Sequence, residues 1–376
     1  MIAFVLLILT SLFLAYTNGA NDNFKGVATL FGSKTTSYKL ALSWATITTL
    51  VGSLFSIFLA EELLKTFSGK GLVPDSLASA PTFLIAVGLG AALTVLIATI
   101  TGFPISTTHS LTGALLGAGI AAIGFNVNFH KLGSTFMIPL LVSPLIALLL
   151  SAILYPLFKY FRRKLGLKKS LCICAVNSEN RLIPITENSS LNMHSTVTQL
   201  ATHGIVMNDE DYCVEEYNGK IIRIPLQKVM EVSHYLSSGL VCFARGLNDT
   251  PKIAGLLMVV HIFSIHWGMI GIAISIALGG ILNTKKVAYK MSKDITPMNQ
   301  GQGLAANMVT GFLVIFASKL GIPVSTTHVS VGSLFGIALV GKTANFKVIK
   351  NILLSWVLTL PLSALFSAGI YRLIAY

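Results

Sequence analysis

The sequence has few charged residues. Only 11% of its 376 residues are Asp, Glu, Lys or Arg, whereas an average soluble domain has about 25%. Hydrophobic residues make up 53% of the chain. This composition excludes a disordered chain, a collagen-like chain and a soluble globular enzyme. It predicts an integral membrane protein built mostly of spanning helices.

Acidic residues are the scarcest charged type. The chain has 14 Asp and Glu against 27 Lys and Arg, which gives a formal net charge of +13. Eight of the 14 acids lie in one polar stretch, residues 160–231, and therefore outside the long apolar runs. Excess Lys and Arg are typical of the cytoplasmic loops of membrane proteins, so we expect no nucleic-acid partner.

Cysteine and nucleotide-binding motifs are also scarce or missing. The four cysteines do not form the paired CxxC spacing of a zinc site, so we expect free thiols and no structural metal. No phosphate-binding loop motif occurs, which disfavours ATP-driven pumping by this chain alone. The four cysteines are Cys172, Cys174, Cys213 and Cys242.

Ten apolar runs of about spanning length predict the transmembrane helices. We divide the chain into a first transmembrane repeat (1–160), a central cytoplasmic module or linker (161–232) and a second, inverted transmembrane repeat (233–376). Asn218-Gly219 in the centre predicts a β-hairpin of residues 212–224. The runs are 1–31 (interrupted), 39–60, 81–101, 104–125, 134–159, 233–261 (interrupted), 262–284, 301–320, 323–341 and 350–374.

Basic residues predict the orientation of these helices. Lys and Arg flank the central stretch and mark two later loops, so we place these segments in the cytoplasm. Counting five crossings back and five forward from the central stretch places both termini outside. The loop at 61–75 is then outside as well. The two halves would then have opposite orientations in the membrane. We expect a multi-pass protein of the cell (inner) membrane.

An internal repeat supports this division. Residues 102–109 read GFPISTTH and residues 321–328 read GIPVSTTH. A second matched pair reads NDNFK at 21–25 and NDTPK at 248–252, each inside an apolar run. An inverted repeat with interrupted helices is the signature of a secondary transporter. The predicted fold class is therefore an all-α integral membrane protein, an inverted-repeat transporter with interrupted or re-entrant helices.

The matched Asn-Asp pairs predict a cation or proton site. A carboxylate inside a bilayer costs at least about 2.5–3.5 kcal/mol, so two at matching positions need a reason. Asn21, Asp22, Asn248 and Asp249 could supply hard oxygen ligands to a coupling ion. The alternative is that each Asp only caps the start of a helix.

The two Pro-x-Ser-Thr-Thr-His segments predict an anion site. Gly-x-Pro ends one helix, and the hydroxyl residues after it can begin the next. A helix start inside a membrane presents free N–H groups and a positive dipole end, which suit a tetrahedral oxyanion; the alternative is an ordinary cap. We give the following His109 and His328 supporting roles. The candidate anion-binding residues are Ser106, Thr107, Thr108, Ser325, Thr326 and Thr327.

Lys25 and Lys252 complete the candidate site. Each follows its Asp by three residues, which places the two side chains on one helix face as an ion pair. The ammonium could neutralise the Asp, replace a bound cation or contact the anion. We include both lysines among the candidate anion-binding residues.

These motifs resemble those of the inorganic phosphate transporter (PiT) family. The resemblance covers both halves and implies an inverted-repeat carrier that moves phosphate with sodium or protons. It implies that the two aspartates serve cation coupling and that the Ser-Thr-Thr residues serve the anion. The chain departs from the animal members at Thr49 and Asn307, where they carry glutamate, and at both lysines.

We therefore predict a secondary active transporter of inorganic phosphate by Na⁺ or H⁺ symport, and not an enzyme. The alternative is a permease for sulfate or another inorganic oxyanion in the same family. A channel and a membrane enzyme fit less well, because the polar groups cluster and no catalytic triad acid is evident. Apart from the coupling ion no cofactor is expected. The expected partners are the anion, the lipid bilayer and, as one option, a second copy in a homodimer.

Overall fold

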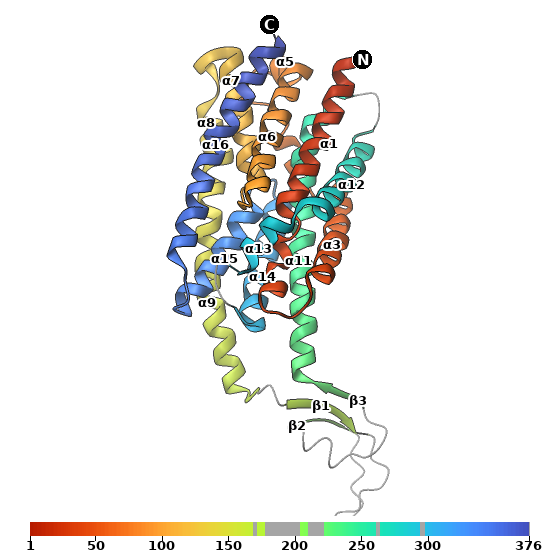
Figure 1. The fold of residues 1–376 in the computed structure, drawn as a ribbon, viewed down its shortest axis with the longest axis vertical. Coiled ribbons are helices and arrows are strands. Elements are labelled where there is room, and N and C mark those ends of the chain that lie inside the picture. The colour runs from red at the N-terminus through yellow and green to blue at the C-terminus, as the bar shows by residue number, and fades with distance from the viewer. Residues whose placement is uncertain (168–170, 177–203, 210–221, 261–263, 294–297, 376) are drawn as a thin grey trace, which may run out of the picture. The chain divides into compact units, whose positions relative to one another are not determined.

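The apolar runs of the sequence form the helices of the structure, a computed structural model (Figure 1). It describes residues 1–167, 171–176, 204–209, 222–260, 264–293 and 298–375. The chain divides into two compact units, which we call unit 1 (Met1–Lys159 with His234–Tyr376) and unit 2 (Tyr160–Ser233).

The helices begin and end close to the predicted runs. The first group is α1 (Ile2–Asp22), η1 (Lys25–Val27), α2 (Ala28–Gly32), α3 (Tyr38–Leu59), α4 (Glu61–Thr66), α5 (Asp75–Ala78), α6 (Pro81–Thr101), α7 (Thr107–Ile123), η2 (Gly124–Asn126), α8 (Phe129–Lys131), η3 (Leu132–Met137) and α9 (Ile138–Lys164). The second group is α11 (Leu226–Ala254), η4 (Gly255–Leu257), α12 (Ile265–Asn283), α13 (Lys285–Lys293), α14 (Gln300–Lys319), α15 (Thr326–Val340) and α16 (Phe346–Ala375).

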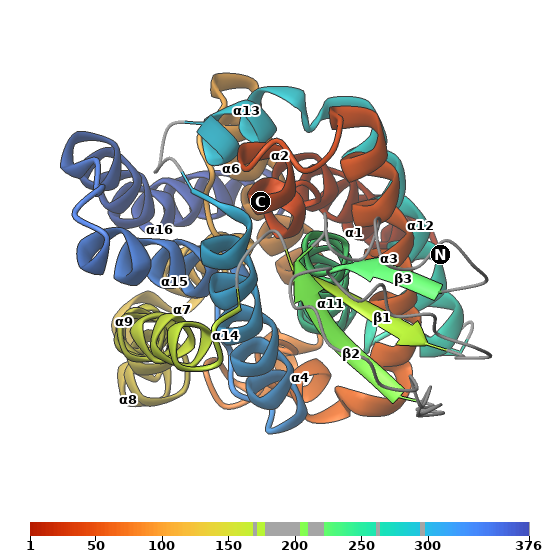
Figure 2. The same ribbon diagram turned by 90° about the horizontal axis from the view of Figure 1, so that it is seen from below.

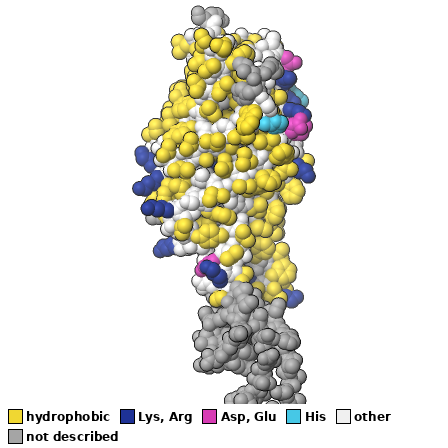
Figure 3. All heavy atoms as spheres, turned by 90° about the vertical axis from the view of Figure 1, so that its right-hand side faces the viewer, with side chains coloured by type: hydrophobic (Ala, Val, Ile, Leu, Met, Phe, Trp, Pro, Cys, Tyr) yellow, Lys and Arg dark blue, Asp and Glu magenta, His cyan; other side chains and the backbone are white. Residues whose placement is uncertain are grey.

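Eight helices or helical stretches of the described chain are long and apolar enough to cross a membrane. Large hydrophobic side chains on α9 and α16 are exposed, such as Leu149 at 60% and Leu365 at 71%. Figure 3 shows a face of the molecule on which hydrophobic side chains predominate. An exposed apolar surface of this kind suits contact with lipid rather than with water.

Glycines bring the two repeated helices against their neighbours. A Cβ atom on Gly117 of α7 would lie 2.0 Å from the carbonyl oxygen of Ala364 in α16. On α15, a Cβ on Gly336 would lie 2.3 Å from the carbonyl oxygen of Leu148 in α9. Only glycine permits such close backbone contact, so these two residues let the helices pack closely.

The helices of unit 1 surround the segments that carry the repeated motifs. Viewed along the helices, α7, α9, α15 and α16 lie on one side and α1, α3 and α12 on the other, with α11 and α14 between them (Figure 2). Two non-helical segments, 102–106 and 321–325, lead into α7 and α15. Each opens on a glycine with positive φ, Gly102 at 78° and Gly321 at 68°, which ends the preceding helix.

The second Asn-Asp motif does not begin a helix, contrary to the helix-cap alternative. Helix α11 continues through Pro251 to Ala254, and the break comes after it, in η4. Likewise Asp22 is the last residue of α1. Neither Asp is therefore an N-cap, and the helix-cap interpretation of both is wrong. Membrane helices tolerate proline where neighbouring groups satisfy the freed backbone atoms.

Unit 2 contains a small antiparallel sheet. Its strands are β1 (Leu171–Val176), β2 (Gly204–Asp209) and β3 (Ile222–Pro225), in the order β2-β1-β3. In the central strand, Ile173 lies opposite Met207 on one side and Ile224 on the other. The predicted hairpin turn at Asn218-Gly219 lies outside the described residues.

Candidate functional site

The two repeated aspartates meet at one amide. The side-chain nitrogen of Asn18 lies 3.3 Å from Oδ2 of Asp22 and 3.3 Å from Oδ2 of Asp249. It also donates to Oγ1 of Thr107 at 2.9 Å. All four side chains are at most 4% exposed. Residues from both halves of the sequence thus form one buried polar centre.

The serines of the repeated segments begin helices, as predicted. The Ser106 hydroxyl accepts a hydrogen bond from the backbone N–H of His109 at 3.1 Å, and Ser325 accepts one from His328 at 3.2 Å. Each serine is therefore the N-cap of its helix, α7 or α15. The cap satisfies one N–H of the first turn, while the helix itself offers no partner to the preceding ones.

The threonines after these serines cross between the halves. The hydroxyl of Thr108 donates to the carbonyl oxygen of Val324 at 3.2 Å, and that of Thr327 donates to the carbonyl oxygen of Ile105 at 3.0 Å. Each helix start therefore contacts the extended segment that leads into the other helix. Thr326 is also buried, at 7% exposure. The structure brings the two predicted anion-binding segments together.

The two lysines lie in this crossing. The Lys25 ammonium forms an ion pair with Asp22 and donates to the carbonyl oxygen of Ile105 at 2.7 Å and to Thr327 Oγ1 at 2.8 Å. It also donates to Oδ1 of Asn21 at 2.9 Å. Its protons therefore point at protein oxygens.

Lys252 makes the matching contacts from the second half. Its ammonium donates to the carbonyl oxygen of Val324 and to Thr108 Oγ1, both at 2.7 Å. Oδ1 of Asp249 lies 3.5 Å away. Both lysines are at most 4% exposed, so these are ion pairs in the interior rather than at the surface.

Asn21 and Asn248 fasten the extended segments. The Asn21 amide donates to the carbonyl oxygen of Phe103 at 3.0 Å and accepts from the N–H of Ile105 at 3.2 Å. Asn248 donates to the carbonyl oxygen of Val324 at 3.2 Å. Asn248 therefore shares the Val324 carbonyl oxygen with Lys252, whereas Asn21 holds the N–H of Ile105, the residue whose carbonyl oxygen Lys25 contacts.

The two histidines lie next to each other in the first turns of α7 and α15. The ring centroids of His109 and His328 are 4.4 Å apart, and His328 stacks on Trp356 at 3.7 Å. Nδ1 of His328 lies 3.4 Å from the carbonyl oxygen of Leu140. These contacts support the ends of α7 and α15.

Sequence reasoning missed Asn18 and Arg245. Arg245 is 1% exposed, and its Nη2 donates to Oδ1 of Asn23 at 3.2 Å and to Oγ1 of Thr49 at 3.4 Å. Its Nε and Nη1 have no partner among the described residues. A signal was present: each of the two residues precedes its motif Asp by four positions, in NGAND and RGLND. A lone arginine inside an apolar run is itself a functional signal.

The positions at which animal members of the family carry glutamate have neutral side chains here, Thr49 and Asn307. Thr49 faces Arg245, as described above. Oδ1 and Nδ2 of Asn307 lie 3.2 and 2.9 Å from Oγ1 of Thr29, and Nδ2 lies 3.3 Å from Oγ of Ser237. Neither position adds a carboxylate to the buried centre.

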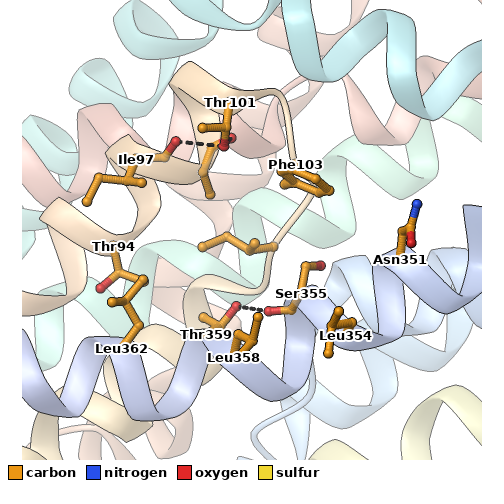
Figure 4. A pocket seen from close by; sticks show the side chains of 12 residues that line it. Thr94, Ile97, Thr101, Phe103, Asn351, Leu354, Ser355, Leu358, Thr359 and Leu362 are labelled. Atoms are coloured by element: carbon orange, nitrogen blue, oxygen red, sulfur yellow. Dashed lines mark hydrogen bonds between the residues drawn. The ribbon is translucent and has the colours of Figure 1, made fainter.

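A cavity of about 350 Å³ lies between α6 and α16. Phe103 and Ile105 form part of its wall, and Thr94, Asn351 and Thr359 give it a few polar groups (Figure 4). Most of its lining is apolar. It therefore lies against the extended segment but lacks the charged groups of the buried centre.

The chain also matches a known protein family. The model of the phosphate transporter family matches residues 18–367. The chain belongs to this family. It is a family of transporters and not of enzymes, and its members are multi-pass membrane proteins.

Relatives and a solved structure extend the match over nearly the whole chain. A protein named "Putative phosphate permease" from Thermococcus kodakarensis is 27% identical, over 96% of this chain and 95% of its own length. One of the same name from Haemophilus influenzae is 27% identical over 96% and 93%. A solved structure described as a sodium-dependent phosphate transporter superposes with a TM-score of 0.75 at 21% identity, covering 100% and 99% of the two chains. This similarity shows the fold.

Proposed function

We propose that this chain is a secondary carrier of inorganic phosphate, driven by symport of Na⁺ or H⁺, and that the buried centre around Asn18 is its transport site. The family match supports phosphate as the substrate. The names of the relatives also refer to phosphate, and none supports sulfate.

One observation carries the site assignment. Asp22 and Asp249 contact the same amide, Asn18, beside the start of α7. Two carboxylates gathered in a bilayer-embedded body are costly unless a cation or proton compensates them. The donor set fits such an ion, because carboxylate, hydroxyl and backbone carbonyl oxygens are the ligands of hard cations.

The same centre offers donors to an oxyanion. The first turns of α7 and α15 bring N–H groups and the positive ends of two helix dipoles. The hydroxyls of Thr108 and Thr327 would donate to the anion once they release the carbonyl oxygens of Val324 and Ile105. Placing the anion beside the coupling ion lowers the cost of a charged substrate in a low-dielectric interior. Ser106, Thr107, Thr108 and the matching residues from Ser325 are therefore our proposed anion-binding groups.

The crossed contacts favour alternating access by an inverted repeat. Thr108 bonds to Val324 and Thr327 to Ile105, so each half holds the extended segment of the other. Breaking one set of these contacts while keeping the other would open the centre to one side. Rocking of two related halves around a fixed midplane site is typical of such carriers.

Uptake of labelled phosphate into proteoliposomes tests the proposal. Na⁺ and pH gradients are imposed independently, and labelled sulfate is measured in parallel. We expect concentrative uptake of phosphate that Asp22→Asn abolishes, while Asp75→Asn, which changes an exposed carboxylate on α5, leaves it intact. Sulfate uptake without phosphate uptake would contradict the substrate, and normal concentrative uptake by Asp22→Asn would remove that residue from the coupling site.

A further inference from the structure

We infer that Lys25 and Lys252 are built-in cations. In this inference, which rests on the proposed function, each ammonium takes the place that a coupling cation would hold, so phosphate transport by this chain does not require Na⁺. A proton is then the coupling ion.

The surroundings of Lys25 resemble a cation-binding cage. Four oxygens of four kinds face its nitrogen: the carboxylate of Asp22, the amide of Asn21, the backbone carbonyl of Ile105 and the hydroxyl of Thr327. The oxygens of Asn21, Ile105 and Thr327 lie 2.7–2.9 Å from the nitrogen. Hard oxygens contributed partly by non-helical backbone are the ligands by which broken-helix carriers bind Na⁺.

The hydrogen bonds around each lysine suit an ammonium. The Thr327 hydroxyl already donates its proton to the Ile105 carbonyl, so it can only accept from Lys25. Thr108 likewise donates to Val324 and accepts from Lys252. A carbonyl oxygen also only accepts. These neighbours therefore present acceptors to each nitrogen, which an ammonium with three N–H donors and no acceptor matches.

Both cages are shared between the halves. Each lysine contacts the extended segment of its own half and a threonine of the other: Lys25 contacts Ile105 and Thr327, and Lys252 contacts Val324 and Thr108. Because the contacts of the two lysines match, an incidental ion pair of the kind found on protein surfaces does not explain them. Buried ion pairs require such additional partners to offset desolvation.

A tethered cation changes the energetics of coupling. It neutralises Asp22 or Asp249 as Na⁺ would, but the chain retains it, so it takes no energy from a Na⁺ gradient. A Na⁺ ion entering the same cage would meet the ammonium charge at close range. Phosphate uptake should therefore follow the pH gradient and be indifferent to external Na⁺.

The first measurement compares wild-type uptake of labelled phosphate in Na⁺ and in choline, at a fixed inward pH gradient. We expect equal initial rates. A wild-type carrier that transports phosphate only in Na⁺ would overturn the inference while leaving the proposed function intact. A wild-type carrier that transports no phosphate under either gradient would instead contradict the proposed function.

The second measurement empties one cage. Lys25→Ala leaves the oxygens of Asp22, Asn21, Ile105 and Thr327 in place, and we expect uptake to fall at least about tenfold in choline, as expected when one partner of a buried ion pair is removed. Na⁺ should restore it. The double variant Lys25→Ala/Asp22→Asn, which lacks the carboxylate, should not respond to Na⁺. Failure of Na⁺ to act on Lys25→Ala would contradict the cage.

Thermal unfolding of the purified, full-length carrier supplies a readout that does not need transport. Na⁺ should raise the melting temperature of Lys25→Ala but not that of the wild type, because only the emptied cage binds the ion. Lys65→Ala, which removes an exposed lysine of α4, is the matched control and should resemble the wild type. Equal Na⁺ stabilisation of the wild type and Lys25→Ala would overturn the inference.

Discussion

At the scale of single residues, the site combines matched and unmatched side chains. Lys25 and Lys252 make equivalent contacts, but Asn18 and Arg245, four positions before the two aspartates, do not. Asn18 faces both carboxylates, whereas Arg245 turns toward Asn23. The buried centre is therefore asymmetric, although the segments around it are matched between the two halves.

Asn18→Leu tests this centre. The change keeps the branched shape and removes the amide that donates to both carboxylates, so we expect phosphate uptake to fall at least about tenfold, equivalent to about 1.4 kcal/mol. Asn283→Leu removes an exposed amide of α12 that bonds to Tyr16 and is the matched control. Initial rates in proteoliposomes measure both, and equal rates for the two variants would contradict the role of Asn18.

The repeat revealed most of these residues, and the exceptions have a physical reason. Asp22 and Asp249 were identifiable because a carboxylate in an apolar run is costly. Asn18 carries little such cost because its amide is neutral, so its sign in the sequence was its position four residues before Asp22. Its contacts to Asp249 and Thr107 arise from residues 231 and 89 positions away, which periodicity cannot reveal.

At the scale of elements, the N-cap serines Ser106 and Ser325 stabilise the first turns of α7 and α15. Ser106→Ala removes the acceptor for the His109 N–H, which costs about 1 kcal/mol. We expect weaker phosphate affinity, seen as a higher half-saturation concentration of uptake, and the same for Ser325→Ala. Ser106→Thr keeps the cap and should recover most of the affinity.

Ser264→Ala is the control for these variants. Ser264 caps α12 by accepting from the His266 N–H at 3.4 Å, but it is exposed and outside the buried centre. The Ser264→Ala variant should have a less stable α12 but an unchanged affinity for phosphate. Unchanged affinity in both Ser106→Ala and Ser325→Ala would contradict a role of the helix starts in anion binding.

The close contact of α7 with α16 gives a prediction about folding. In Gly117→Ala the new methyl group would lie 2.0 Å from the Ala364 carbonyl oxygen, so the backbones must separate. We expect a clearly lower melting temperature in detergent. Gly369→Ala, on α16 itself, meets no atom within 4 Å and should melt like the wild type. Equal melting of both variants would contradict this packing.

The positions of the helices were predictable from hydropathy, but the form of their interruptions was not. The run at 81–101 corresponds to α6 to the residue, because Pro81 begins it and Gly102 ends it. The motif at 248–252 resembled a helix break, yet α11 continues through it. Whether proline breaks a membrane helix depends on neighbouring groups, which the local sequence does not contain.

At the scale of the whole molecule, the positions of the two termini in unit 1 agree with the predicted topology. Figure 1 places the N-terminus, the C-terminus and α5 at one end of unit 1. The basic-residue pattern predicted the same-side arrangement of these three segments. Helix α16 runs from the other end, where Lys347 is exposed, toward this one.

Cysteine labelling in intact cells tests the orientation. In a variant without its four native cysteines, Asp75→Cys and Arg372→Cys should react with a membrane-impermeant maleimide, because the basic loops hold the opposite end in the cytoplasm. Lys347→Cys should react only after permeabilisation. Reaction of all three in intact cells, or of Lys347→Cys alone, would contradict the topology. That result would also contradict an odd number of crossings in each half. The two Ser-Thr-Thr-His segments would then not have opposite orientations, on which alternating access around a shared centre depends.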